Sequence, residues 1–180
     1  NPTIFPTAFL RSHIPILLIR HPALAFPSTI RVASKFFGHP VGETFMKIIL
    51  RYRWHRILYE WYEHDSCQPD GSPQPLVLDA DELMYDRTAV EELCVRTGLD
   101  PKSVRYEWSS MTEKEMQMQY EGEAIFLDTL LGSEGVVEGK GSNGLRVEDE
   151  LQKWKSEFGE ERAEILRHMV ESAMGDYEFL

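Results

Sequence analysis

Residues 14–32 read IPILLIRHPALAFPSTIRV and contain two patterns in succession. Ile14–Ile19 is an apolar run with the length and composition of a β-strand that is buried on both faces. The polar turn Arg20-His21-Pro22 ends the run, and from Ala23 to Phe37 the apolar residues recur at helical spacing. The stretch therefore predicts a buried strand, a turn carrying an arginine, and a helix with Ser28 near its start.

A second strand, turn and helix are predicted over residues 75–98. Leu76-Val77-Leu78 is a short apolar strand, and the acidic turn Asp79–Leu83 follows it. Thr88-Ala89-Val90-Glu91 has the pattern of a capping box, and Gly98 is a helix stop. Buried strands that alternate with helices predict an α/β fold with parallel strands, and two strands cannot complete such a sheet.

Two further helical regions and one loop are predicted. Apolar residues at three-to-four spacing predict a long amphipathic helix over residues 43–66, and residues 147–180 form a C-terminal helical cap broken near Gly159. Thr112–Glu115 is a second capping box, and Gly-rich residues 132–144 predict a mobile or ligand-shaping loop.

Composition indicates one globular domain, because 42% of the 180 residues are hydrophobic and 27% are charged. Residues 1–66 carry eight lysines and arginines against four acidic residues, whereas residues 67–180 carry eleven against twenty-six. A basic segment in an acidic protein suits a local anionic ligand and argues against nucleic-acid binding. No apolar stretch is long enough to span a membrane, and two cysteines without ligand spacing suggest a reducing, cytoplasmic setting and no metal site.

The strongest chemical pattern is LLIRHPALAFPSTIRV, residues 17–32, in which a serine follows a strand-end arginine by eight positions. It resembles the phosphate-binding segment of P-loop sulfotransferases. The resemblance implies that Arg20 and Ser28 hold the 3′-phosphate of 3′-phosphoadenosine-5′-phosphosulfate. A planar guanidinium can contact two phosphate oxygens, and a helix start adds a hydroxyl and free amides. The alternative for an isolated pair is that Arg20 binds a carboxylate and Ser28 caps a helix.

The stretch PLVLDADELMYDRTAVEELCVRTGLD, residues 75–100, looks like the sulfotransferase strand and acidic turn that lead into a helix. The two stretches and the helix between them cover residues 14–100. Ala80 stands where the cytosolic animal enzymes place a tyrosine against adenine, and the Asp-Ala-Asp-Glu-Leu form is closer to the microbial and fungal branch of the family.

Near the end of the chain, Gly139-Lys140-Gly141 followed by Lys153-Trp154-Lys155-Ser156-Glu157-Phe158 is similar to the family's C-terminal motif. The resemblance implies that Lys140 and Gly141 close over the nucleotide, although the insertion before Trp154 exceeds the usual spacing. Trp154 and Phe158 themselves have the spacing of core residues.

The chain has no P-loop sequence, neither the usual Gly-x-x-x-x-Gly-Lys-Ser/Thr form nor the sulfotransferase variant. In the family, the P-loop lysine and the catalytic histidine precede the arginine and serine, so both are expected upstream of Asn1. None of the six histidines stands in a family position for a catalytic base. Each is expected to be a surface or structural residue.

The resemblance implies the C-terminal part of a three-layer, helix-rich P-loop sulfotransferase fold with a central parallel sheet. The whole protein would transfer a sulfuryl group from phosphoadenosine phosphosulfate to a small-molecule hydroxyl or amine, without a metal, in secondary metabolism. Its expected partners are that acceptor and either an N-terminal P-loop half or a second copy of the chain, with neither nucleic acid nor membrane. Trp54, Trp61 and Tyr62 are predicted in the core, with an acceptor pocket as the alternative.

Two other functions stay open from the sequence. One is a sulfotransferase-fold protein whose pocket serves different small-molecule chemistry, since fold does not fix function. The other is a non-catalytic interaction protein in which Arg20 is structural.

Overall fold

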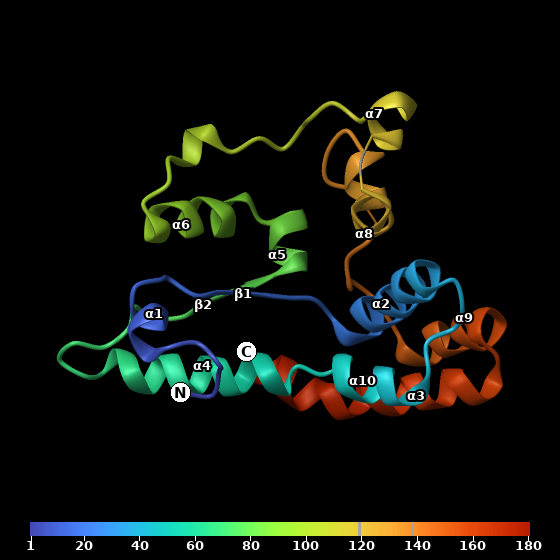
Figure 1. The fold of residues 1–180 in the computed structure, drawn as a ribbon, viewed down its shortest axis with the longest axis horizontal. Helices are drawn as coiled ribbons and strands as arrows, with labels where there is room; N and C mark the ends of the chain where they lie inside the picture. The colour runs from blue at the N-terminus through green and yellow to red at the C-terminus, as the bar shows by residue number, and fades with distance from the viewer. Residues whose placement is uncertain (119, 138) are drawn as a thin grey trace.

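The computed structural model describes residues 1–118, 120–137 and 139–180, which form a helix-rich α/β fold (Figure 1). The strands are β1 (Ile16–Ile19) and β2 (Leu76–Asp79), and a short 3-10 helix covers Pro101–Ser103. The α-helices are α1 (Thr7–Arg11), α2 (Pro22–Phe37), α3 (Glu43–Ile49), α4 (Arg53–Ser66), α5 (Ala80–Tyr85), α6 (Arg87–Thr97), α7 (Glu113–Gln117), α8 (Glu121–Leu131), α9 (Val147–Phe158) and α10 (Glu160–Phe179).

The two strands form a parallel sheet, as the alternation of strands and helices predicts. Leu17 pairs with Val77, and Ile19 pairs with Asp79. Since the carboxyl ends of parallel strands meet at one edge, Arg20 and the start of α5 lie at the same edge of the sheet.

The prediction that the first strand is buried on both faces is wrong for β1. Leu17 and Ile19 are buried, but Ile16 is 41% exposed and Leu18 is 60% exposed. Helices α4 and α10 run along one side of the sheet, and α5 and α6 lie on the other (Figure 1). Helix α6 stands beside Leu76 and Leu78 of β2, which are buried, and within the described residues nothing equivalent covers β1. A complete three-layer sheet therefore stays a prediction.

The core lies where β1 ends, among α2, the α3–α4 junction, α9 and α10. Trp154, Leu166 and Val170 are fully enclosed there. Trp154 thus has the core position that its spacing with Phe158 predicts, and Phe158 packs against the same cluster. This cluster includes Ile19, the last residue of β1, and thereby fixes the position of Arg20.

The single long helix predicted over residues 43–66 is wrong, because the chain forms α3 and α4 with a break between them. Leu50 ends α3 in a non-helical conformation, and its side chain is buried. Tyr52, just before α4, is also buried, and its ring stacks on Phe26 of α2 with centroids 5.8 Å apart. The break lets both side chains enter the core, which one continuous helix face could not do.

Helix α2 begins earlier than the sequence pattern predicts. Its first residue is Pro22, whose missing N–H costs little there, and Nδ1 of His21 accepts a hydrogen bond from the Ala23 amide at 3.2 Å. Ser28 therefore lies in the second turn, so its expected place at the helix start is wrong. Thr29 does not cap the helix either, since its hydroxyl donates to the Ala25 carbonyl at 3.0 Å.

The helix predicted after the acidic turn is present as α6, but its start differs. Asp86 caps it by accepting from the Thr88 amide at 2.8 Å, so the capping box predicted at Thr88 is wrong. The stop at Gly98 is confirmed, with a left-handed φ of 75°. The capping box at Thr112 is also confirmed, at the start of α7.

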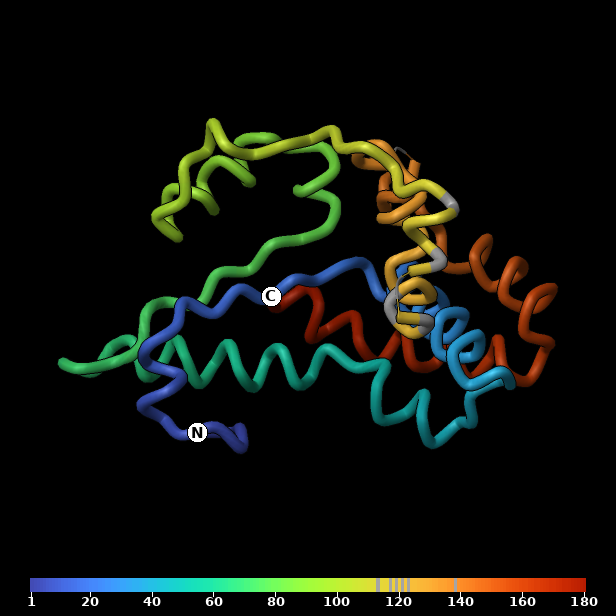
Figure 2. The backbone as a smooth tube through the Cα atoms, turned by 45° about the horizontal axis from the view of Figure 1, so that its top comes forward, coloured from blue at the N-terminus to red at the C-terminus, as the bar shows by residue number. Residues whose placement is uncertain are grey.

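The predicted break at Gly159 is confirmed. This glycine has φ 86° and ψ 160°, a conformation open almost only to glycine, and it separates α9 from α10. Helix α10 continues to Phe179, so residues 176–179 are helical. The tube in Figure 2 shows its end returning to the sheet, where the Tyr177 hydroxyl donates to Asp79, the last residue of β2, at 2.6 Å.

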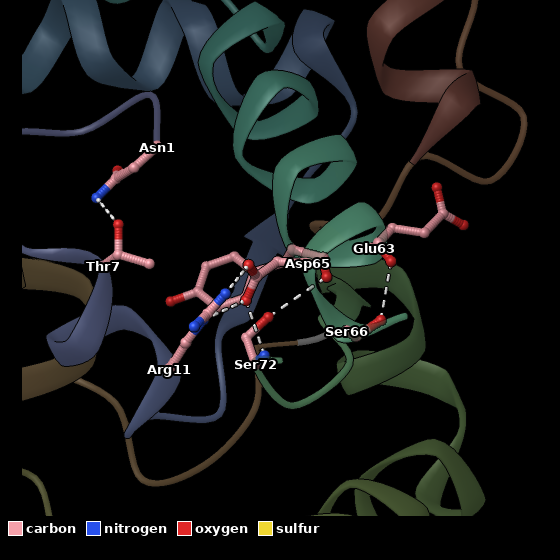
Figure 3. A network of polar contacts seen from close by, with 8 residues as sticks. Asn1, Thr7, Arg11, Glu63, Asp65, Ser66 and Ser72 are labelled. Atoms are coloured by element: carbon pink, nitrogen blue, oxygen red, sulfur yellow. Dashed lines mark hydrogen bonds and ion pairs between the residues drawn. The ribbon is translucent and has the colours of Figure 1, made fainter. Parts of the chain in front are cut away.

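The N-terminal segment is attached to the end of α4 by one polar cluster (Figure 3). The Arg11 guanidinium donates to both carboxylate oxygens of Asp65, at 2.9 and 2.7 Å, and Asp65 also accepts from the Ser72 amide at 2.8 Å. The hydrogen bond from Arg11 is the main cause that lowers the pKa of Asp65 from 3.8 to about 2. The cluster fixes the chain that leads into β1.

Across the described ranges, no helix combines the length and the apolar character that a membrane crossing needs.

Candidate functional site

Arg20 is the first residue after β1, and its backbone is held by one buried tyrosine. The Arg20 amide donates to the Tyr52 hydroxyl at 3.1 Å, and that hydroxyl donates to the Arg20 carbonyl at 2.5 Å. Burial is the largest cause of the raised pKa of Tyr52. Both backbone groups that the sheet leaves free are thereby satisfied, and the direction of the Arg20 side chain is fixed.

The Arg20 side chain keeps unused hydrogen-bonding capacity. Its Nη2 donates to the Lys140 carbonyl at 2.7 Å. Its Nε is buried and has no partner among the residues that the structure describes. A guanidinium has five N–H donors, and an unpaired buried donor is costly, so this group is suited to an external acceptor.

The four binding residues inferred from sequence lie around one cavity. Arg20, Ser28, Lys140 and Gly141 all line a space of about 400 Å³. Arg20 and Ser28 come from the β1–α2 segment, and the other two come from the glycine-rich loop about 120 residues later. The remaining lining includes Ala23, Leu24, Pro27, Arg31, Gly139, Asn143, Gly144, Leu145, Glu150 and Lys153.

Ser28 reaches this cavity from the second turn of α2. The helix start itself is occupied by the His21 cap, and burial lowers the pKa of His21. Pro27, immediately before Ser28, has no N–H and also lines the cavity. Ser28 therefore offers its hydroxyl to the cavity, whereas the free amides predicted beside it are absent because the residue lies inside the helix.

The unpaired charge in the cavity is positive. Arg31 forms a bidentate ion pair with Glu157 at 2.6 and 2.7 Å, and Lys153 pairs with Glu150 at 2.5 Å. Within the described part of the chain, Arg20 and Lys140 have no carboxylate partner. An anion with several acceptor oxygens would satisfy both cations.

The glycine-rich loop is anchored by residues that the sequence pattern did not identify. The Asp81 carboxylate accepts from the Ser142 amide, 3.1 Å from each oxygen, and from the Ser142 hydroxyl. The Tyr85 ring lies against Gly141, where an added Cβ would be 2.4 Å from the ring. Positions 81 and 142 are 61 residues apart, so no local spacing could reveal this contact.

Asp79 and Glu82 shape the start of α5 rather than line the cavity. The Asp79 side chain accepts from the Asp81 amide at 2.7 Å, and Glu82 accepts from the Asp79 amide at 3.1 Å. The acidic turn is thus a capping box, as expected of a helix-start feature. Among the described residues, no group of three or more histidine, cysteine, aspartate or glutamate side chains could hold a metal ion.

A larger cavity, of about 700 Å³, lies between the α3–α4 junction and α10. Tyr52 lines it from the side opposite Arg20. The aromatic residues proposed for an acceptor pocket do not line it. Trp54 is 59% exposed, so its predicted core position is wrong, whereas Tyr62 is a core residue whose hydroxyl donates to the Leu10 carbonyl at 3.2 Å. Its lining includes the charged residues Glu43, Lys47, Arg51, Arg53, Glu164 and Asp176, and also His168.

Comparison with known proteins finds two similar fungal proteins. Sulfotransferase ppzF of Metarhizium rileyi and sulfotransferase ppzF of Metarhizium majus are each 35% identical to the chain over 187 residues. The chain is thus similar over its whole length to these two fungal proteins. The match covers 100% of this chain and 55% of each relative, so the chain spans about half the length of the curated relatives it matches.

No protein-family model matches the chain, and no solved structure matches it. The sulfotransferase relationship therefore rests on the two fungal proteins, and it extends the resemblance at residues 14–100 to the whole chain.

Proposed function

We propose that this chain is the nucleotide-binding, C-terminal part of a sulfotransferase-like protein that uses 3′-phosphoadenosine-5′-phosphosulfate. The supporting observation is that Arg20, Ser28, Lys140 and Gly141 line one cavity although they come from distant parts of the sequence. The similarity to two fungal sulfotransferases over the whole chain supports the same function.

The residues of the cavity fit a phosphate group. The Arg20 Nε is buried without a partner in the described chain, and the ammonium of Lys140 and the hydroxyl of Ser28 supply further donors. Arg20 and Ser28 would hold the 3′-phosphate, and Lys140 and Gly141 would close over it. The bound nucleotide would supply the activated sulfuryl group, while these residues bind and orient it.

The rest of the reaction needs groups that the cavity does not contain. Sulfuryl transfer needs positive charge on the leaving oxygen and a base for the acceptor hydroxyl or amine. We assign these roles to a P-loop half that would pack against β1. The exposed apolar side chains of Ile16 and Leu18 support such a contact, because an element packed on that face of the sheet would bury them.

The proposal is tested by calorimetric titration of the chain with 3′-phosphoadenosine-5′-phosphate. We expect saturable binding by the native protein and a loss of about 10- to 100-fold in affinity for Arg20→Ala, because charge-assisted hydrogen bonds contribute about 1.5–3 kcal/mol. Ser28→Ala should weaken binding less, since it removes one neutral donor. Arg105→Ala removes an equal charge from an exposed position outside the cavity and serves as the control.

Either of two results would overturn the proposal. If the folded native protein does not bind the nucleotide with its P-loop half present, the cavity serves another chemistry. If Arg20→Ala and Arg105→Ala weaken binding equally, the effect is one of net charge and the cavity is not the site.

A further inference from the structure

The loop that carries Lys140 and Gly141 is held from outside the cavity by helix α5. Asp81 and Tyr85 do not line the cavity, yet they contact the two residues that follow Lys140. Tyr85 lies against Gly141, and Asp81 binds Ser142. Both contacts come from the first and last turns of one short helix that starts at the end of β2.

The loop needs such support because its own backbone is permissive. Gly139 and Gly144, on either side of the contact, both have positive φ, at 74° and 73°. Glycine in this region adopts many conformations in the free chain, so ordering the loop costs entropy. Among the described residues, two side-chain contacts tie residues 139–144 to the edge of the sheet. One is the hydrogen bond from Arg20 to the Lys140 carbonyl, and the other is the hydrogen bonding between Asp81 and Ser142.

We propose that Asp81 is a positioning residue for nucleotide binding: its carboxylate holds the glycine-rich loop in the closed arrangement before the phosphate arrives. This inference rests on the proposed function of the cavity. The carboxylate accepts from both the amide and the hydroxyl of Ser142, so one side chain fixes the backbone and the side chain of the residue two positions after Lys140.

The same arrangement leaves donors of the Arg20 side chain available for a ligand. Arg20 donates one N–H to the Lys140 carbonyl, while Asp81 holds the loop two residues further on, at Ser142. With Asp81 in place, Arg20 does not have to hold the loop alone. A preorganised loop avoids part of the ordering cost at the moment of binding.

Two measurements on the same set of proteins test this role. The first is the affinity for 3′-phosphoadenosine-5′-phosphate, and the second is amide hydrogen exchange of residues 139–145 without nucleotide. Asp81→Ala should weaken binding about tenfold and accelerate exchange in the loop, because the closed arrangement becomes a minor fraction of the ensemble. Ser142→Ala keeps its amide and should show a smaller change of the same kind.

The matched control is Glu82→Ala. Glu82 pairs with Asp79 in the capping box of α5 and supports the start of this helix, but among the described residues it makes no hydrogen bond with residues 139–144. It should leave loop exchange and nucleotide affinity unchanged. A merely structural role of this acidic turn would instead make Glu82→Ala and Asp81→Ala behave alike.

The outcomes separate this inference from the proposed function. If the native protein binds the nucleotide and Asp81→Ala binds it equally well, or loop exchange does not change, Asp81 has no positioning role and the proposed function stands. If the native protein does not bind the nucleotide at all, the proposed function fails, and the inference fails with it.

Discussion

At the scale of single residues, Arg20 combines a fixed backbone with an unsatisfied side chain. Tyr52 bonds both its amide and its carbonyl, whereas the buried Nε has no partner among the described residues. Proteins rarely leave buried donors unpaired, and the exceptions often mark places where a ligand supplies the acceptor. The phosphate site that we propose would account for this exception.

Replacement of Tyr52 by phenylalanine tests the support of Arg20. The variant leaves a part-buried amide and carbonyl of Arg20 without their partner, so we expect the free energy of unfolding to fall by about 1–3 kcal/mol. Urea denaturation would measure the change. Tyr59→Phe is the control, because the Tyr59 hydroxyl makes no hydrogen bond in the described structure; an equal loss in both variants would contradict the role given to Tyr52.

The residues of the candidate site were predictable from the sequence only where they belong to a short local pattern. The spacing of Arg20 and Ser28, and the Gly139-Lys140-Gly141 pattern, drew attention to residues that line one cavity. The supports of that cavity were not predictable. Asp81 binds Ser142 across 61 residues, and no pattern in either segment marks the pair.

At the scale of elements, the helices end where backbone and burial requirements outweigh periodicity. Apolar spacing across residues 43–66 is continuous, yet the helix breaks because Leu50 and Tyr52 both enter the core. The break at Gly159 was predictable because glycine itself supplies the signal. A break that depends on tertiary packing leaves no comparable mark in the sequence.

Gly159→Ala tests the second of these breaks. The backbone at this position has φ 86° and ψ 160°, so an alanine is expected to lower the free energy of unfolding by about 1–3 kcal/mol. Gly175 lies inside α10 with open space around its Cα, and Gly175→Ala should raise stability by up to about 1 kcal/mol. Thermal denaturation of both variants would check the opposite signs; destabilisation by both would point to packing instead.

At the scale of the whole molecule, the sheet has one face that is complete only over β2. The sequence predicted parallel strands, which the structure confirms, and burial on both faces, which β1 contradicts. The prediction treated apolar composition as evidence of cover within this chain. Apolar composition indicates that a face of a strand is buried in the complete protein, but it does not indicate which residues bury it.

The chain of residues 1–180, studied alone, is therefore expected to self-associate through β1. Leu18→Glu should weaken the association about tenfold, because burying one leucine contributes roughly 1.5–3 kcal/mol. Val95→Glu, on α6, changes a residue that is 68% exposed and should have little effect. Sedimentation velocity over a range of concentrations measures both, and a native chain that stays monomeric throughout would refute the expectation.

The contact between Asp81 and Ser142 also has an evolutionary consequence. Neither Asp81 nor Ser142 lines the cavity, and the two residues are joined by a hydrogen bond. Selection for ligand binding therefore acts on the pair rather than on each position separately. Among homologous sequences, substitutions at positions 81 and 142 should therefore occur together, as donor and acceptor exchanged or as both replaced by apolar residues. The length of the segment between α8 and Gly139 would be free to vary.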